Sequence, residues 1–270
     1  MTAMITTPFP AAAKLMPQFI TVSGTAGRYY AVIPETMRKG AVPLVVVHGI
    51  SRNAAELALR FGEIALLSGT PIIAPLFERK AFGMYQQVRS PSRGLQSDEA
   101  LFGILDDASR RFDCDTAQID LFGFSGGAQF AHRFAMLHPA RARHCIAAAA
   151  GWYTMPDFDA AWPLGLQAAP LQIDKEALAR VRFDVIVGGL DRSQDKALRR
   201  SPAIDAAQGT HRLQRARQWH HAMRNYGFRG GLTVIPGLSH AFSDAVHLGI
   251  VPLVFHLLGT LGADIEESAT

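Results

Sequence analysis

A serine between glycines occurs in the pentapeptide Gly123-Phe124-Ser125-Gly126-Gly127. The residues before it, 119–122, predict a β-strand, and those after it predict a helix that runs towards His138. A serine on such a sharp strand-to-helix turn holds its hydroxyl clear of the sheet, and the free N–H groups of the helix start face any negative charge that develops beside it. The pattern therefore predicts that Ser125 is a nucleophile. The alternative is a serine in a tight turn that has no catalytic role.

From about residue 42 to residue 258 the chain resembles the α/β-hydrolase superfamily, and within it bacterial esterases of the polyhydroxybutyrate-depolymerase and feruloyl-esterase type. In that superfamily the nucleophile is followed along the chain by an acid and then by a histidine, each after a strand. Here the strand predicted at 185–187 leads to Asp191, and the strand predicted at 232–235 leads to His240. The resemblance implies a serine hydrolase that cleaves a carboxylic ester with a Ser125–His240–Asp191 triad.

Each member of this triad would have a defined role. His240 would take the proton of Ser125 and return it to the departing alcohol, while Asp191 fixes the imidazole tautomer and stabilises its protonated form. The N–H of Gly126 is one candidate donor for the oxyanion hole. The second donor, the N–H of Ile50, is implied by resemblance to the His-Gly loop of the superfamily.

Other residues compete for two of these roles. Asp195 lies four residues beyond Asp191 and could reach the same loop, whereas Asp184 precedes its strand and is expected at the opposite edge of the sheet. Asp191 is favoured because of its distance from the strand end. His48 is expected to be a structural ligand of its own loop. Five more histidines are expected in a loop or on helices with structural or exposed positions: His211, His220, His221, His247 and His256.

Alternating strands and helices surround these residues and predict an α/β-hydrolase fold, with a mostly parallel central sheet, helices on both faces and a short cap insertion. A hairpin is predicted over residues 19–33, and further strands at 44–47, 71–74, 119–122, 145–149, 185–187 and 232–235. Helices are expected after Asn53, where Glu56 would complete a capping box, after Ser97 as the cap, over 213–226 and over 244–258. We expect one domain over residues 1–270, with an N-terminal arm at 1–17 and a cap at 152–180.

The sequence defines the substrate less closely than it defines the reaction. Aromatic residues expected near the nucleophile, among them Trp152 and Tyr153, would contact a small-molecule ester, or they are packed in the interior. Arg52, Arg79 and Lys80 could meet an anionic group, or they are surface charges. An acyltransferase on the same scaffold and a non-catalytic binding protein of the same fold are the alternatives to an esterase.

Composition narrows the classes of partner. The formal net charge is +4, and the positive residues are scattered, so no nucleic-acid partner is expected. The N-terminus lacks a signal-peptide pattern, and residues 250–261 are too few to span a bilayer, so no membrane association and a cytoplasmic location are expected. Two cysteines do not form a disulfide framework. No metal-binding spacing or phosphate-binding glycine pattern occurs, so neither a metal nor another cofactor is expected. The oligomeric state is not predicted.

Overall fold

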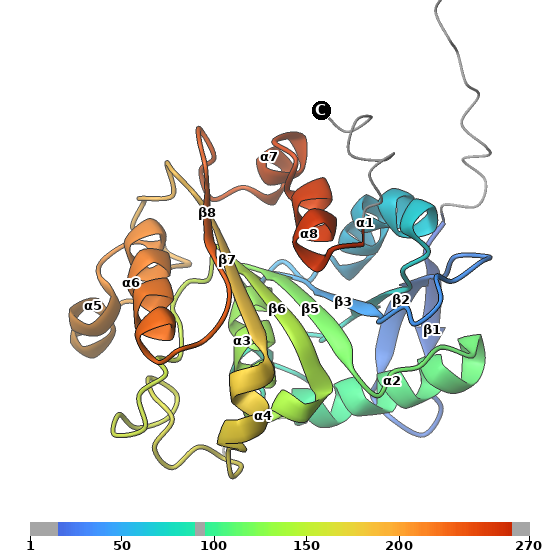
Figure 1. Ribbon diagram of the computed structural model, residues 1–270, viewed down its shortest axis with the longest axis horizontal. Coiled ribbons are helices and arrows are strands. Elements are labelled where there is room, and N and C mark those ends of the chain that lie inside the picture. Colours follow the sequence, from blue (N-terminus) through green and yellow to red (C-terminus); the bar gives the residue numbers. More distant parts are fainter. Residues whose placement is uncertain (1–15, 90–94, 261–270) are drawn as a thin grey trace, which may run out of the picture.

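An eight-stranded sheet forms the centre of the computed structural model, which describes residues 16–89 and 95–260 (Figure 1). The strand order is β1-β2-β4-β3-β5-β6-β7-β8, with β2 antiparallel to both β1 and β4 and every other neighbouring pair parallel. The strands are β1 (Gln18–Thr21), β2 (Arg28–Val32), β3 (Leu44–Val47), β4 (Ile72–Pro75), β5 (Ile119–Phe124), β6 (Ala142–Ala148), β7 (Arg182–Gly188) and β8 (Leu232–Ile235). The predicted hairpin and the mostly parallel sheet are therefore confirmed.

Helices cover both faces of this sheet (Figure 1). They are α1 (Ala54–Ser68), α2 (Ser97–Phe112), α3 (Gly126–Leu137), α4 (Lys175–Arg180), α5 (Pro202–Gln208), α6 (Arg212–Asn225), α7 (Phe242–His247) and α8 (Ile250–Leu258), with short 3-10 turns η2 (Tyr85–Gln87) and η3 (Pro139–Arg141). Val45 and Val47 of β3 join a core with α2, α3 and α6, while Leu44 and Val46 join a second core with α1 and α8. The continuous apolar run of β3 thus reflects burial on both faces, as parallel sheets require.

Two predicted helix starts differ from the structure in their capping. Helix α1 begins after Asn53 as predicted, but the side chain of Asn53 caps no backbone N–H and donates instead to the Glu56 carboxylate, so the predicted capping box is wrong. Ser97 is the first residue of α2 rather than its cap. Its hydroxyl donates to carbonyl oxygens of the preceding turn, with Tyr85 O at 3.0 Å and Val88 O at 2.9 Å.

The single helix predicted over 244–258 is in fact two helices, α7 and α8. Gly249 breaks the run with a left-handed conformation at φ 84°, and Pro252 follows in the first turn of α8. Proline is tolerated there because the first N–H groups of a helix have no partner inside it, whereas in a continuous helix Pro252 would lie in the interior. The break turns the chain so that α8 packs against α1.

The segment predicted as a cap, 152–180, ends in α4 and packs along the α3 side of the sheet. Met155, Phe158 and Trp162 lie partly buried against that core, and the Trp219 indole on α6 donates to Thr154 O at 2.7 Å. The expected N-terminal arm, 1–17, lies outside the described residues except for its last two. The division into one domain with a cap stays a prediction.

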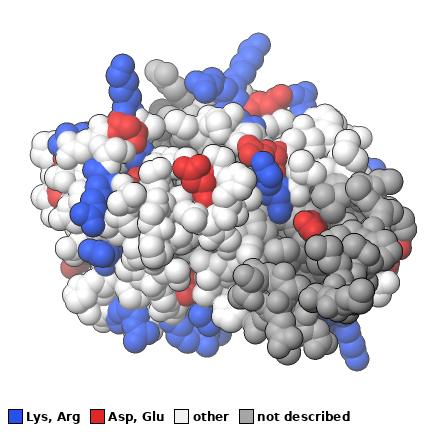
Figure 2. Space-filling model, turned by 90° about the horizontal axis from the view of Figure 1, so that it is seen from above, with Lys and Arg blue, Asp and Glu red and all other residues white. Residues whose placement is uncertain are grey.

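On the face seen in Figure 2, the described residues carry charges of both signs. Lys and Arg side chains there are dispersed around the face and are interspersed with Asp and Glu. Cys114 and Cys145 are both buried and are not joined in a disulfide. No helix among residues 16–89 and 95–260 is long and apolar enough to cross a membrane.

Candidate active site

Ser125 occupies the tight turn between the last residue of β5 and the first residue of α3. Its backbone has φ 56° and ψ −110°, and a positive φ is unfavourable for a residue with a side chain. The conformation is held by the adjacent strand, because the Ser125 N–H donates to Ala148 O at 2.8 Å. Strained backbone of this kind persists only where the surrounding structure enforces it, and it often occurs at functional sites.

The glycines of the motif are required by close backbone contacts. A Cβ at Gly123 would lie 2.2 Å from the carbonyl of Gly127, and a Cβ at Gly127 would lie 1.9 Å from the carbonyl oxygen of Val47 on β3. Any side chain at either position would therefore separate α3 from the sheet. This packing explains the pattern that first identified Ser125.

The His240 side chain lies between those of Ser125 and Asp191 at the carboxyl ends of the parallel strands. The His240 Nε2 lies 3.0 Å from the Ser125 Oγ, and its Nδ1 lies 2.8 Å from the Asp191 Oδ2. Because ionised Asp191 can only accept, Nδ1 carries the proton and Nε2 is left to accept from the serine hydroxyl. The His240 ring also stacks on Phe124, with ring centroids 5.4 Å apart.

The loops that carry Asp191 and His240 are bonded to each other. The Leu190 N–H donates to Leu238 O at 2.9 Å, and the Gly189 N–H donates to Ile235 O at 2.9 Å. A Cβ at Gly188 would lie 2.2 Å from Leu238 O, so glycine at the end of β7 permits this approach. Segments far apart in the sequence thus place the acid and the imidazole on one side of Ser125.

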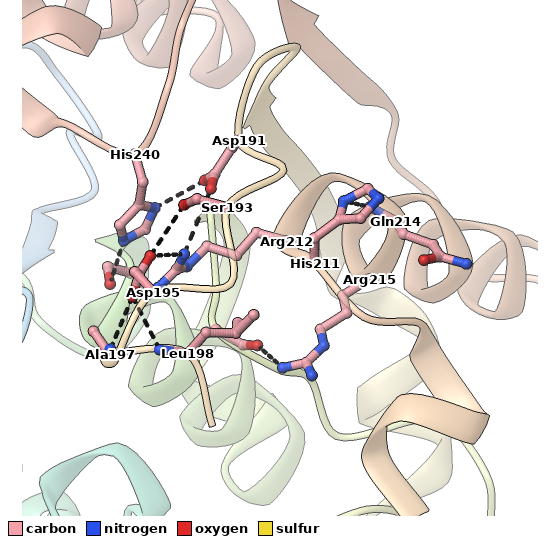
Figure 3. Close-up of polar contacts among 12 residues, drawn as sticks. Asp191, Ser193, Asp195, Ala197, Leu198, His211, Arg212, Gln214, Arg215 and His240 are labelled. Carbon is pink, nitrogen blue, oxygen red and sulfur yellow. Dashed lines mark hydrogen bonds and ion pairs between the residues drawn. The ribbon is translucent and has the colours of Figure 1, made fainter. Parts of the chain in front are cut away.

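Asp195, the competing acid, pairs with an arginine that the sequence did not single out. Arg212 Nη1 lies 2.6 Å from Asp195 Oδ2 and Nη2 lies 3.2 Å from Oδ1, while Nη1 also lies 3.5 Å from Asp191 Oδ1 (Figure 3). The hydrogen bond from Arg212 holds the pKa of the Asp195 carboxyl well below its usual range. Asp184 is within β7 rather than before it, and its carboxylate accepts from His144 and Arg182.

The expected oxyanion donors lie side by side. Gly126 is the first residue of α3, where helical N–H groups have no partner inside the helix. The Ile50 nitrogen lies 3.3 Å from the position that a Cβ would take on Gly126. The Tyr85 hydroxyl lies 2.6 Å from the same Cβ position and donates to His48 O, in the loop that carries Ile50, at 2.8 Å.

His48 is a structural residue of the loop, as expected. Its Nδ1 lies 2.8 Å from Gly49 O, and its Nε2 accepts from the Phe77 N–H at 3.0 Å. Complete burial lowers the pKa of His48 to about 4, so the ring is neutral in both contacts at neutral pH. Among the other histidines, His211 caps α6 by accepting from the Gln214 N–H at 3.2 Å. The other four histidines that were expected at structural or exposed positions lie on helices: His220 and His221 on α6, His247 on α7 and His256 on α8.

The buried neutral state of His48 predicts a loss of stability in acid. Its pKa in the folded state is below the ordinary value of 6.5, so the unfolded chain binds the additional proton. The contribution is absent above about pH 6.5 and grows as the pH falls towards 4, where it reaches roughly 3 kcal/mol in favour of unfolding. Urea unfolding between pH 7 and pH 4 measures the slope of the free energy of unfolding against pH. His48→Gln, which cannot titrate, is expected to show a smaller slope, and an equal slope would contradict the assignment.

A pocket of about 210 Å³ opens beside Ser125 and His240. Within the part of the chain that the structure describes, its remaining lining is mainly apolar and contains no Lys, Arg, Asp or Glu: Gly49, Ile50, Ser51, Asn53, Leu57, Phe124, Ala197 and Phe242. Arg52 is turned away from this lining, since it donates to the backbone carbonyls of Phe77 and Phe82 and lies over the Tyr85 ring. Arg79 and Lys80 are exposed.

Trp152 and Tyr153, which were expected to contact substrate, are buried and absent from the pocket lining. The Arg133 guanidinium lies over the Trp152 ring at 4.2 Å. Tyr153 stacks on Trp219 with ring centroids 4.7 Å apart, and its backbone N–H and carbonyl bond to the side chain of Gln208. These contacts agree with the alternative interpretation, in which the two aromatic side chains are packed in the interior. Within residues 16–89 and 95–260, no group of three or more His, Cys, Asp or Glu is arranged to hold a metal ion.

The sheet order, the strand-to-helix turn at Ser125 and the loops after β7 and β8 define the α/β-hydrolase fold. No family model and no curated protein matches the sequence, but solved structures do match. Poly(aspartic acid) hydrolase-1 from Sphingomonas sp. KT-1 superposes with a TM-score of 0.75 at 24% identity, covering 88% of this chain and 97% of that one. A poly(3-hydroxybutyrate) depolymerase from Bordetella parapertussis gives 0.72 at 24% identity, covering 94% of each. A ferulic acid esterase gives 0.57 at 15% identity, covering 91% and 96%. The resemblance expected from the sequence is thus confirmed at the level of the fold.

Proposed function

We propose that the protein is a serine hydrolase that cleaves small carboxylic esters through an acyl-enzyme on Ser125. The observation that carries the proposal is the His240 ring, which bonds through Nε2 to the Ser125 hydroxyl and through Nδ1 to the Asp191 carboxylate. A serine hydroxyl is a weak nucleophile until a base accepts its proton, and this arrangement provides that base with a fixed tautomer. The names of the structural neighbours, a hydrolase, a depolymerase and an esterase, support the same class.

The reaction proceeds in two halves. In the first, Ser125 Oγ bonds to the ester carbonyl carbon while its proton moves to His240 Nε2, and the N–H groups of Gly126 and Ile50 stabilise the oxyanion. The tetrahedral intermediate then expels the alcohol, which takes the proton from His240. In the second half, water attacks the acyl carbon and gives a proton to His240, and collapse of the intermediate releases the acid and returns that proton to Ser125. Asp191 stabilises the imidazolium in both halves.

The pocket supports a small, uncharged acyl group. Its volume of about 210 Å³ is below the range of about 300–1,000 Å³ typical of drug-sized ligands. A charged acyl group would find no ionic partner among the described residues of the lining and would lose its hydration.

A panel of p-nitrophenyl esters tests the proposal. Acetate and butyrate esters are expected to be cleaved faster, in kcat/KM, than dodecanoate, because the longer chain exceeds the pocket. A succinate monoester, similar in size to butyrate but charged, is the matched control for charge and is expected to be slower than butyrate. Absence of hydrolysis of every ester by the folded protein would contradict the proposal and would favour a binding role for the fold.

A further inference from the structure

Arg212 and Asp195 form a charged pair directly beside the Asp191–His240 hydrogen bond (Figure 3). Arg212 is only 1% exposed at the start of α6, and both of its Nη atoms engage the Asp195 carboxylate. Its contact with Asp191 is the longer one, 3.5 Å from Nη1 to Oδ1. The guanidinium is therefore directed mainly to Asp195, although Asp191 is the more deeply buried of the two acids.

The unequal contacts of Arg212 with Asp195 and Asp191 determine the charge around the His240 imidazole. Two carboxylates share one guanidinium, so the group of Asp191, Asp195 and Arg212 carries one net negative charge when both acids are ionised. Protonation of His240 balances that charge. Without the charge on Asp195, Arg212 would neutralise Asp191 alone, and a protonated His240 would face a group with no net charge.

We infer that Asp195 is a positioning residue, which acts through Arg212 to keep the charge of Asp191 available to protonated His240. The inference rests on the proposed function, in which His240 becomes protonated during each half of the reaction. It assigns a role to the acid that competes with Asp191 in the sequence: Asp195 does not touch the imidazole in the structure, but it sets how much of the Asp191 charge the imidazole experiences.

The electrostatic coupling between Asp195 and His240 agrees with this role. The pKa of the Asp195 carboxyl is lowered first by the Arg212 hydrogen bond, and a positive charge on His240 acts in the same direction. Such coupling is reciprocal, so ionised Asp195 favours protonation of His240. Partial exposure of Asp195, 37%, weakens the effect through solvent screening.

Other charges near His240 are common to every variant discussed below. The pKa of His211, at the start of α6, is lowered mainly by burial, and the charges of Arg192 and Asp191 act on it in opposite directions. Asp244 on α7 is exposed, and the aromatic neighbours Phe124 and Phe242 are uncharged.

Asp195 also shapes the loop that forms one wall of the pocket, and this second effect has to be separated. Its Oδ1 accepts from the N–H groups of Ala197 at 2.8 Å and Leu198 at 3.1 Å, and Ala197 lines the pocket. A purely structural role predicts that replacing Asp195 lowers kcat or raises KM. It does not predict a shift of the His240 titration with a defined sign.

The test is a nuclear magnetic resonance titration of the His240 ring in a Ser125→Ala background, which requires no catalysis. Adding Asp195→Asn is expected to move the titration midpoint to lower pH by about 0.5–1 unit, because removing a negative charge disfavours the imidazolium. Asp195→Glu keeps the charge and is the matched control, with a midpoint close to that of the parent. An unchanged midpoint in Asp195→Asn, or equal shifts in both variants, would overturn the inference.

A charge-balance variant sharpens the test. Arg212→Met leaves both acids without a cation and is expected to move the midpoint to higher pH, whereas Arg212→Met with Asp195→Asn restores one net negative charge and returns it towards the parent. If the double variant titrates at a lower pH than Asp195→Asn alone, that result would argue against the charge mechanism. If the Arg212 variants fail to fold, the comparison of Asp195→Asn with Asp195→Glu still decides.

With Ser125 intact, the acid limb of the kcat/KM profile is expected to shift to lower pH by the same amount in Asp195→Asn, and kcat to fall about three- to tenfold. Lack of any Ser125-dependent hydrolysis in the parent would refute the proposed function alone, because the titration of His240 is measured without turnover. A parent that hydrolyses esters while the Asp195→Asn titration stays unchanged would refute this inference alone.

Discussion

Replacing Ser125 with alanine is expected to lower kcat for ester hydrolysis by about a million-fold, the loss typical of removing the nucleophile from a serine triad. The loss is large because the acyl-enzyme cannot form, while the N–H groups of Gly126 and Ile50 remain and sustain only slow attack by water. Initial rates on p-nitrophenyl butyrate at high enzyme concentration measure it, with thermal melting to establish that the variant is folded.

Ser51→Ala is the matched control, since Ser51 also lines the pocket but its hydroxyl donates to Asn53 rather than meeting a base. It is expected to change the rate by no more than about threefold, the scale of one lost neutral hydrogen bond of less than about 1 kcal/mol. A Ser125→Ala variant that retains more than about a thousandth of the parental rate would show that hydrolysis proceeds without the proposed nucleophile.

Replacing Asp191 with asparagine is expected to lower kcat by about ten-thousandfold while leaving the geometry in place. An amide at this position can donate to Nδ1, which stabilises the tautomer that carries its proton on Nε2 and cannot accept the Ser125 proton. The substitution also removes a buried carboxylate close to Arg212, so thermal melting accompanies the rate measurement.

The same substitution at Asp195 distinguishes the two acids. Asp195→Asn is expected to cost no more than about tenfold in kcat, because Asp195 bonds to Arg212 and the backbone rather than to His240. The reverse order of effects, with Asp195→Asn the more damaging, would identify Asp195 as the acid of the triad.

Local pattern was sufficient to predict the sheet and the strand-to-helix turn at Ser125. Ser125 was identifiable because backbone contacts allow only glycine at Gly123 and Gly127. The two glycines therefore form a pattern that can be recognised in the sequence. Asp191 and His240 were indicated by the chain order of the superfamily that the sequence resembles. They lie close together because the carboxyl ends of parallel strands are at the same edge of a sheet.

Residues whose roles depend on packing between distant elements were not predictable in this way. Arg212 reaches Asp191 and Asp195 only because α6 begins beside the loop after β7, and nothing in its own neighbourhood along the chain indicates that contact. Trp152 and Tyr153 follow a strand end as substrate-contacting residues do, but their rings are held in the interior by Arg133 and Trp219.

The most direct test of the central claim is to identify the atom that becomes acylated. The protein is quenched in acid during turnover of a slowly released ester, such as p-nitrophenyl trimethylacetate, and the intact mass and its peptides are measured. The account predicts one added trimethylacetyl group on the peptide that contains Ser125, and no such adduct in Ser125→Ala. An adduct on a different residue, or steady ester cleavage by a folded Ser125→Ala protein at the parental rate, would contradict it.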